Sequence, residues 1–480
     1  MEIAVRSSVR PFWRARVGTV PLLAGLVCVS ALIHVLAAWL RATPVYFSDE
    51  YMYAELGRSF AESGLPLVRG ELAPFPALVY PFLTAPAWLL GDVDASWRAA
   101  QLFGAVAMSL ACVPVFVLGR RLGLSRGLAL ALAALAIGVP DMVYAGWILA
   151  ETVAYPLALA AFAAGVLALA SPTRRAQLAF LAFAAIATGT RAQFAVLFVV
   201  YPIAATVLGL AERRCPAVAR EQTFALAAVG AAVVVAVAAG PSRVLGMYRD
   251  VLGADVEPAL LLDRIGSNAL VLGYASAWIL IPGAVLGFGL ALARPATRVE
   301  RAFAALAVPF VAALVVEASL FATPQNVQER YAFYALPLLA LAFGLYAARG
   351  WPLRLVHAGL AAALLSVAAV FPLSGYTPGD GKTHSAFLLA TGRLEEIVGD
   401  SAGASLLVAT LAGVCLLIAT AASVRPRLGT PGVLAIAVLL SALAAAGATW
   451  WHEYLPPTTP LSTVRDHIAR GPLRAVPTGD

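Results

Sequence analysis

Apolar runs of about 20 residues, almost free of charge, follow one another along most of this chain of 480 residues. Such a run is long enough to cross a bilayer as a helix, and a helix satisfies its own backbone hydrogen bonds where lipid offers none. Only 12% of the residues are charged, whereas soluble domains carry about 25%. The sequence therefore predicts an all-α, polytopic membrane protein and excludes a soluble enzyme, a disordered chain and a disulfide scaffold.

We expect about 13 membrane-spanning helices. Their predicted positions are residues 18–40, 95–118, 127–140, 147–170, 177–190, 192–210, 222–240, 265–292, 302–321, 332–348, 353–372, 402–423 and 431–450. Residues 72–90 form a further apolar stretch, which is interrupted by prolines. We expect a short interfacial or re-entrant helix there rather than a full span.

Arginine residues sort the connecting segments into two sets. With a cytoplasmic N-terminus, 19 of the 33 Lys and Arg residues fall on the inside, together with four of the 26 acidic residues. This is the distribution that the positive-inside rule describes. It predicts a multi-pass protein of the plasma (inner) membrane with an extracytoplasmic C-terminus. The net charge of +7 then reflects topology, and we expect no nucleic-acid partner.

The outside segments are the long ones, and they hold most of the acidic, Tyr and Trp residues that lie between the spans. They are residues 41–94, 241–264, 322–331, 373–401 and 451–480. The sequence therefore predicts its chemistry on the extracytoplasmic face.

Two adjacent acids open the first outside segment. Asp49 and Glu50 follow Ser48 and precede a helical stripe of apolar residues. Paired carboxylates at a water–lipid boundary can deprotonate an acceptor or bind a divalent metal such as Mg²⁺ or Mn²⁺. The alternative is a solvated helix start, with the two acids in the first turn.

Two further charges lie within or beside apolar runs. Glu151 lies a few residues inside the predicted span 147–170, where a carboxylate is costly and indicates a functional site. Arg191 separates two short apolar runs at the outer face, and an arginine there can bind a lipid phosphate through two hydrogen bonds. The alternatives are a hydrogen bond to a neighbouring helix for Glu151 and an interfacial anchor for Arg191.

A polar stretch from Gln328 to Tyr331 precedes the span 332–348. Arg330 is a second candidate for binding phosphate, and Tyr331 can stack or donate a hydrogen bond. The alternative is an interfacial belt of Arg and Tyr. Asp141, which follows Pro140, is expected nearer the surface as a turn cap.

Several classes of site are absent from the sequence. It contains no G-x-x-x-x-G-K-[ST], H-E-x-x-H or G-x-S-x-G motif and no His/Cys spacing typical of zinc. Ionisable residues are nearly absent from the centres of the spans, which argues against an ion-coupled transporter.

Taken in order, these motifs resemble those of the GT-C membrane glycosyltransferases, and among them the lipid-A aminoarabinose transferases and the protein O-mannosyltransferases. The motifs that carry the resemblance are Ser48-Asp49-Glu50 with Tyr53-Ala54-Glu55, Leu149-Ala150-Glu151, Thr190-Arg191 and Glu329-Arg330-Tyr331. Met52 departs from the arginine of the aminoarabinose transferases.

The resemblance implies a GT-C-like fold with short extracytoplasmic juxtamembrane helices, and transfer of a sugar from a polyprenyl-phosphate carrier to a lipid, glycan or protein acceptor. It implies a catalytic core over residues 1–348 and C-terminal helices and loops over 349–480. It assigns Asp49 as general base, with Glu151 sharing that role or orienting hydroxyl groups. Residues that would bind the substrate are Glu50, Tyr53, Arg191, Arg330 and Tyr331. Whether Asp49 and Glu50 bind a divalent metal stays an open question.

Other functions compete with this interpretation. The chain could be a transporter or flippase of a lipid-linked envelope precursor, or a non-catalytic scaffold. It could also be a glycan polymerase or ligase that depends on His384, Arg393 and Glu395 in segment 373–401.

Overall fold

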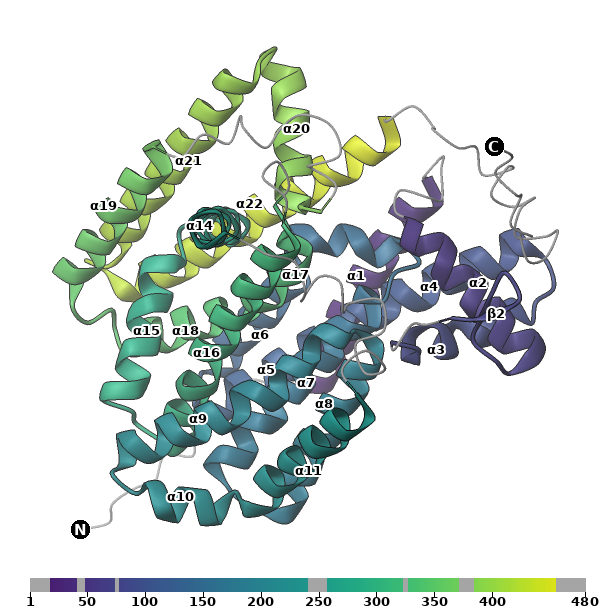
Figure 1. The fold of residues 1–480 in the computed structure, drawn as a ribbon. Coiled ribbons are helices and arrows are strands. Elements are labelled where there is room, and N and C mark those ends of the chain that lie inside the picture. The colour runs from purple at the N-terminus through teal and green to yellow at the C-terminus, as the bar shows by residue number, and fades with distance from the viewer. Residues whose placement is uncertain are drawn as a thin grey trace, which may run out of the picture.

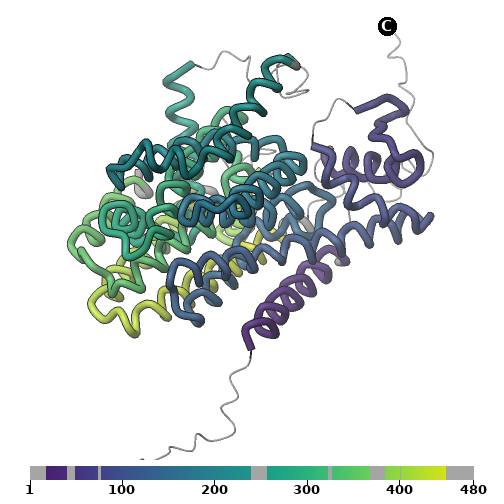
Figure 2. Tube along the Cα trace, turned by 90° about the horizontal axis from the view of Figure 1, so that it is seen from below, coloured from purple at the N-terminus to yellow at the C-terminus, as the bar shows by residue number. Residues whose placement is uncertain are grey.

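The computed structural model describes residues 18–40, 48–73, 77–240, 257–322, 327–370 and 384–454. Within these ranges the chain is helical apart from one two-stranded hairpin, so the all-α prediction is confirmed. Long helices run side by side in one bundle, and a smaller unit of α2, α3 and the hairpin lies at one end of it (Figures 1 and 2).

In the first half of the chain, apolar helices alternate with short 3₁₀ segments, labelled η. The elements are α1 (Thr19–Leu40), α2 (Ser48–Ser63), β1 (Leu67–Val68), β2 (Glu71–Leu72), α3 (Val79–Trp88), α4 (Val93–Ser109), α5 (Cys112–Arg121), α6 (Arg126–Ala136), η1 (Pro140–Gly146), α7 (Glu151–Ala170), α8 (Arg174–Thr190), η2 (Ala192–Ala195), α9 (Val196–Glu212), α10 (Cys215–Glu221) and α11 (Thr223–Ala239).

The second half continues the same pattern. Its elements are α14 (Pro258–Ala275), α15 (Ile281–Ala293), α16 (Arg298–Phe321), α17 (Glu329–Ala332), η4 (Phe333–Ala335), α18 (Leu336–Ala348), α19 (Arg354–Val370), α20 (Ala386–Val398), α21 (Ser401–Ala422) and α22 (Pro426–Tyr454). Helices α20 and α22 pack against η1, so this half contacts the first half close to the candidate site.

Eight helices in the described ranges are long and apolar enough to cross a membrane, or up to ten if two bent pairs each count as one span. The chain is therefore a multi-pass membrane protein, but the predicted count of about 13 is not confirmed. The continuous span predicted over 265–292 is wrong. Two helices, α14 and α15, replace it because Ala277 and Trp278 adopt left-handed backbone angles, with φ of 60° and 58°.

The short apolar helix predicted within 72–90 is present as α3. It packs against α2, and Tyr53 meets Tyr80 edge to face with ring centroids 5.1 Å apart. Between the two helices, the hairpin turns through Arg69 and Gly70, both with positive φ, as two-residue turns of antiparallel strands require. The Arg69 N–H donates to Glu55 at 2.6 Å, which ties the turn to α2.

Arg98 of α4 ties three elements together beside the candidate site. Its guanidinium donates to the Ala38 carbonyl of α1 at 2.8 Å and to the side chain of Gln101 at 3.0 Å. Gln101 in turn donates to the Gly146 carbonyl at 2.9 Å. The buried 3₁₀ segment η1 is thereby held against α1 and α4, although it bends 62° away from α6.

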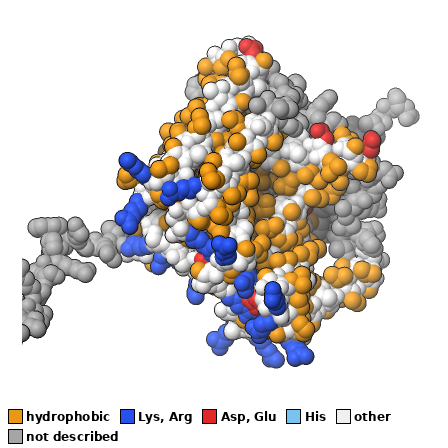
Figure 3. All heavy atoms as spheres, turned by 90° about the vertical axis from the view of Figure 1, so that its left-hand side faces the viewer, with side chains coloured by type: hydrophobic (Ala, Val, Ile, Leu, Met, Phe, Trp, Pro, Cys, Tyr) orange, Lys and Arg blue, Asp and Glu red, His pale blue; other side chains and the backbone are white. Residues whose placement is uncertain are grey.

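Segments predicted to share the inside face meet at one end of the bundle. Arg298 pairs with Glu212 at 3.0 Å, and Arg349 pairs with Glu300, so three of the predicted inside loops are in contact. Figure 3 shows most of the Lys and Arg side chains on its visible face gathered towards one end of a largely hydrophobic surface. This grouping is what the arginine pattern predicted.

Helices α15 and α18 approach closely at Gly287, where an added Cβ would lie 1.9 Å from the Ala342 carbonyl oxygen. Small residues allow such approaches between membrane helices. We expect Gly287→Ala to destabilise the protein by about 1–3 kcal/mol, since the helices must separate, and thermal unfolding of the purified protein measures this. Gly289→Ala is the matched control, because its Cβ meets open space. Equal unfolding temperatures for the two variants would contradict the packing described here.

Candidate active site

Four charged side chains from four separate segments form one ionic cluster. Arg330 of α17 donates through Nη2 to Asp49 Oδ2 at 2.9 Å and through Nε to Glu151 Oε1. Arg191, at the junction of α8 and η2, donates through Nη1 to the same Glu151 oxygen. The structure thus brings together four of the residues that the sequence predicted for one site.

Exposure differs strongly within the cluster. The Glu151 side chain is fully buried, and the side chains of Arg330 and Arg191 are 5% and 10% exposed, whereas Asp49 is 39% exposed. Two carboxylates balance two guanidinium groups, so the formal charge of the cluster is zero. Its buried part is held by charge-assisted hydrogen bonds, and Asp49 is the member that solvent reaches.

Local backbone structure explains how each group reaches the cluster. Glu151 is the first residue of α7, where the helix dipole favours a carboxylate. It was predicted a few residues further inside the helix. Arg191 is extended and ends α8. The Arg330 N–H donates to the His384 carbonyl at 2.9 Å, which fixes α17 against the segment before α20.

Aromatic rings cover one side of the cluster. The Arg191 guanidinium lies 4.8 Å from the centroid of the Tyr331 ring, a cation–π contact. Tyr331 also stacks on Phe321 at 4.8 Å, and its carbonyl accepts a hydrogen bond from Gln193 at 3.2 Å. The Tyr331 ring therefore helps to hold the Arg191 guanidinium in its orientation.

The other predicted binding residues face different neighbours. Glu50 is fully buried and accepts the Ile148 N–H at 3.0 Å, which holds α2 against the segment before Glu151. Tyr53 is buried against Tyr80. Their predicted contact with a substrate stays a prediction.

Asp49 and Glu50 do not form a ready metal site. One carboxylate is paired with Arg330 and the other with a backbone N–H. No group of three or more His, Cys, Asp or Glu side chains suited to a metal occurs in the described part of the chain.

Sequence reasoning assigned no role to Glu329. The structure buries its carboxylate, which accepts hydrogen bonds from the Ser385 hydroxyl and, at 3.1 Å, from the Phe387 N–H. Glu329 thus holds the first turn of α20 beside the cluster. Asp141 was expected near the surface and is instead fully buried next to Glu329, because η1 lies beneath α20 and α22.

His384 lies at the edge of the same region, as part of the predicted outside segment 373–401. Burial lowers the pKa of His384 to about 4, so its imidazole is neutral at neutral pH. Arg393, further along α20, pairs with Glu396 at 2.5 Å on an outer face of the helix. Residues 373–383 of this segment and residues 455–480 lie outside the described ranges.

An apolar cavity of about 250 Å³ is lined by residues of α14, α20, α21 and α22, and none of the four residues of the ionic cluster lines it. Its wall includes Pro140, Tyr274, Trp278, Phe387 and Leu440. An aliphatic chain would fit such a lining.

Glu151→Gln should destabilise the protein strongly, because it removes the carboxylate that pairs with buried Arg191 and leaves buried Arg330 with only the partly exposed Asp49. Removing one partner of a buried ion pair costs about 3–5 kcal/mol. Thermal unfolding in detergent measures the loss. The control is Glu62→Gln, which breaks an exposed pair with Arg58 and should cost less than about 1 kcal/mol. Similar losses for the two variants would show that the cluster is not the buried ionic unit described.

No protein-family model and no curated protein matches the chain. Solved structures do match it. ArnT from Cupriavidus metallidurans in the apo state is 17% identical, with a TM-score of 0.51 over 95% of this chain and 78% of that one. The same protein bound to undecaprenyl phosphate is 19% identical, with a TM-score of 0.54 over 96% of this chain and 87% of that one.

A third match is the apo oligosaccharyltransferase of Archaeoglobus fulgidus. It is 13% identical, with a TM-score of 0.50, and the match covers 84% of this chain but only 56% of that chain. At such identities a structural match establishes the fold and leaves function to be argued from the site. The chain therefore has the fold that ArnT and the archaeal oligosaccharyltransferase share, in agreement with the GT-C-like fold that the resemblance of its motifs implied.

Proposed function

We propose that the protein is an integral-membrane glycosyltransferase that moves a sugar from a polyprenyl-phosphate carrier to an acceptor hydroxyl. The observation that carries the proposal is the ionic cluster, in which two guanidinium groups and a partly exposed carboxylate lie together. The match to ArnT bound to undecaprenyl phosphate supports a lipid-phosphate carrier. The acceptor is a lipid, a glycan or a protein.

Asp49 is the general base in this proposal. It accepts the proton of the acceptor hydroxyl as that oxygen attacks the anomeric carbon of the sugar. Its exposure of 39% leaves room for an acceptor, whereas Glu151 is fully enclosed. The Arg330 guanidinium at 2.9 Å holds the Asp49 carboxylate in place.

Arg191 and Arg330 stabilise the leaving group. When the bond from the anomeric carbon to the phosphate oxygen breaks, the electron pair stays on the phosphate, which then needs cations more than a proton. A guanidinium has five N–H donors, and Arg191 uses Nη1 in its ion pair with Glu151, so donors of Arg191 remain for phosphate oxygens.

Glu151 positions both guanidinium groups through one oxygen. Its second oxygen, Oε2, is buried and has no hydrogen-bond partner among the described residues. A hydroxyl of the sugar or a water molecule can satisfy that oxygen. We assign Glu151 this orienting role and leave proton abstraction to Asp49.

The reaction is proposed to occur on the extracytoplasmic face of the plasma (inner) membrane, with the N-terminus in the cytoplasm. The charge pattern supports this orientation, because the arginine-rich loops meet at one end of the bundle. Helix α9 separates Arg191 from those loops by the length of a membrane span.

Asp49→Asn should lower sugar transfer by about 10²–10⁴-fold, since the amide cannot take the hydroxyl proton. Purified protein in vesicles with a polyprenyl-phosphate sugar provides the assay, and binding of polyprenyl phosphate should persist. Asp92→Asn is the control, because Asp92 caps α4 by accepting the Ala95 N–H and asparagine caps equally well. Full activity of Asp49→Asn would remove Asp49 from the mechanism, and movement of carrier lipid without transfer would favour a flippase.

Arg191→Gln should reduce the rate of transfer by about 10²-fold, the typical loss when a group that stabilises developing negative charge is removed. Arg191→Lys keeps the charge but loses the planar donor pair, so an intermediate rate is expected. The test compares rates of sugar transfer at a saturating concentration of the sugar donor, between variants with matching unfolding temperatures. Equal rates for Gln and Lys would contradict a role for the cation.

A further inference from the structure

An open hollow of about 560 Å³ lies where α9 ends and α16 begins. The side chains that define it are Glu212, Arg213, Arg214, Thr297, Arg298 and Arg301. Four arginines and one acid therefore line a single concave surface. None of these residues belongs to the ionic cluster around Glu151.

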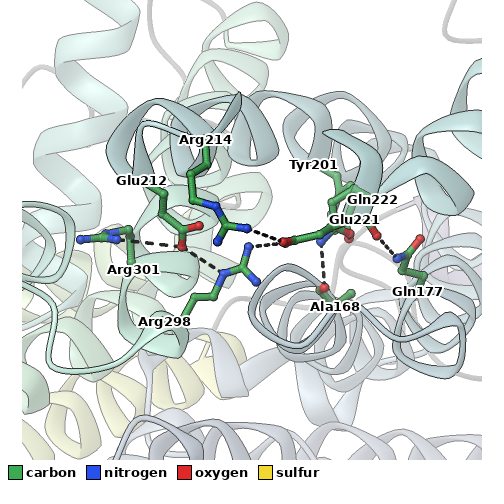
Figure 4. Close-up of polar contacts among 9 residues, drawn as sticks. All are labelled: Ala168, Gln177, Tyr201, Glu212, Arg214, Glu221, Gln222, Arg298 and Arg301. Carbon is green, nitrogen blue, oxygen red and sulfur yellow. Dashed lines mark hydrogen bonds and ion pairs between the residues drawn. The ribbon is translucent and has the colours of Figure 1, made fainter. Parts of the chain in front are cut away.

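The acidic side chains in and beside the hollow, Glu212 and Glu221, already form ion pairs with its arginines, as Figure 4 shows. Arg298 donates to Glu212 at 3.0 Å and to Glu221 at 2.5 Å. Arg301 lies 3.9 Å from Glu212, and Arg214 lies 3.5 Å from Glu221. These contacts position the arginines but leave more guanidinium groups than carboxylates.

The local charge is therefore positive. The Arg213 side chain is exposed and has no ion pair with any described residue. Helix α16 begins at the hollow, with Thr297 as its N-cap accepting the Glu300 N–H, so the positive end of a helix dipole adds to the arginines.

The hollow lies at the far end of a candidate membrane span from the candidate active site. The candidate span that starts just after Arg191 ends at Glu212 and has 21 residues, which corresponds to about 30 Å of helix. Leu210 of α9, which precedes the hollow-lining Ala211, is 65% exposed. Charged donors therefore adjoin apolar surface, as at a site for a lipid headgroup.

We propose that this hollow binds the phosphodiester headgroup of an anionic phospholipid. Arg213 and Arg214 contact the phosphate oxygens, and the acyl chains lie along the exposed apolar surface of α9. Planar guanidinium groups bind such oxygens in pairs. A lipid source is favoured over free phosphate because the hollow opens next to apolar surface at the end of a span.

Arg213 offers a variant that removes charge without harming the fold. It ends α9 with φ of 54°, in the left-handed region where glycine is favoured. Arg213→Gly therefore relieves strain, and Arg214→Gln removes only the weak 3.5 Å pair with Glu221. The matched control is Arg174→Gln with Arg175→Gln, another adjacent pair of exposed arginines on the predicted inside face.

The test measures the unfolding temperature of the full detergent-purified chain against the concentration of short-chain phosphatidylglycerol. Matched titrations use phosphatidylcholine of the same chain length and inorganic phosphate. We expect phosphatidylglycerol to raise the unfolding temperature of the parent and the control pair, with an apparent Kd at least fivefold weaker in Arg213→Gly/Arg214→Gln.

Three results would overturn the proposal. Equal stabilisation by phosphatidylcholine would remove the role of headgroup charge. Equal affinity for inorganic phosphate would make this a site for the free anion. Equal Kd values in the double variant and the control pair would place any lipid site elsewhere. Sugar transfer is not part of the measurement, so its outcome is independent of the proposed enzymatic function.

Discussion

The carboxylate of Glu151, shared by two guanidinium groups, is the interaction on which the rest of the site depends. It joins the start of α7, the end of α8 and α17 in the interior of the protein. Desolvating three charged groups is expensive, and well-packed apolar residues would often be at least as stable. Stability alone therefore does not explain an ionic cluster of this kind in so apolar a chain, which agrees with the substrate-binding role proposed for it.

Breaks in helices place these charges. Glu151 follows the irregular residues after η1, Arg191 precedes η2, and Arg330 lies just before η4. Irregular backbone at membrane depth is tolerated only where protein or a cavity satisfies it, and here buried aromatic residues such as Trp147 and Phe333 enclose the breaks. The site thus occurs where breaks in several helices lie side by side, since the charged residues at these breaks contact one another.

The fold class and the ionic cluster could be predicted because charge is rare in this sequence, so that each acid or arginine beside an apolar run was informative. The break after α14 could not, since Ala277 and Trp278 are apolar and their left-handed backbone leaves no mark on hydropathy. Glu329 lay within a candidate motif but was given no role, for a different reason. Its partner Ser385 lies 56 residues away, and only tertiary structure makes the burial of this carboxylate visible.

Arg330 forms hydrogen bonds through both its backbone and its side chain. Its backbone N–H donates to the His384 carbonyl and its side chain donates to Asp49. The residues just before α20 and the first turn of α2 therefore share Arg330 as a hydrogen-bonding partner. The position of the Arg330 guanidinium beside Asp49 therefore depends on the position of the chain at His384.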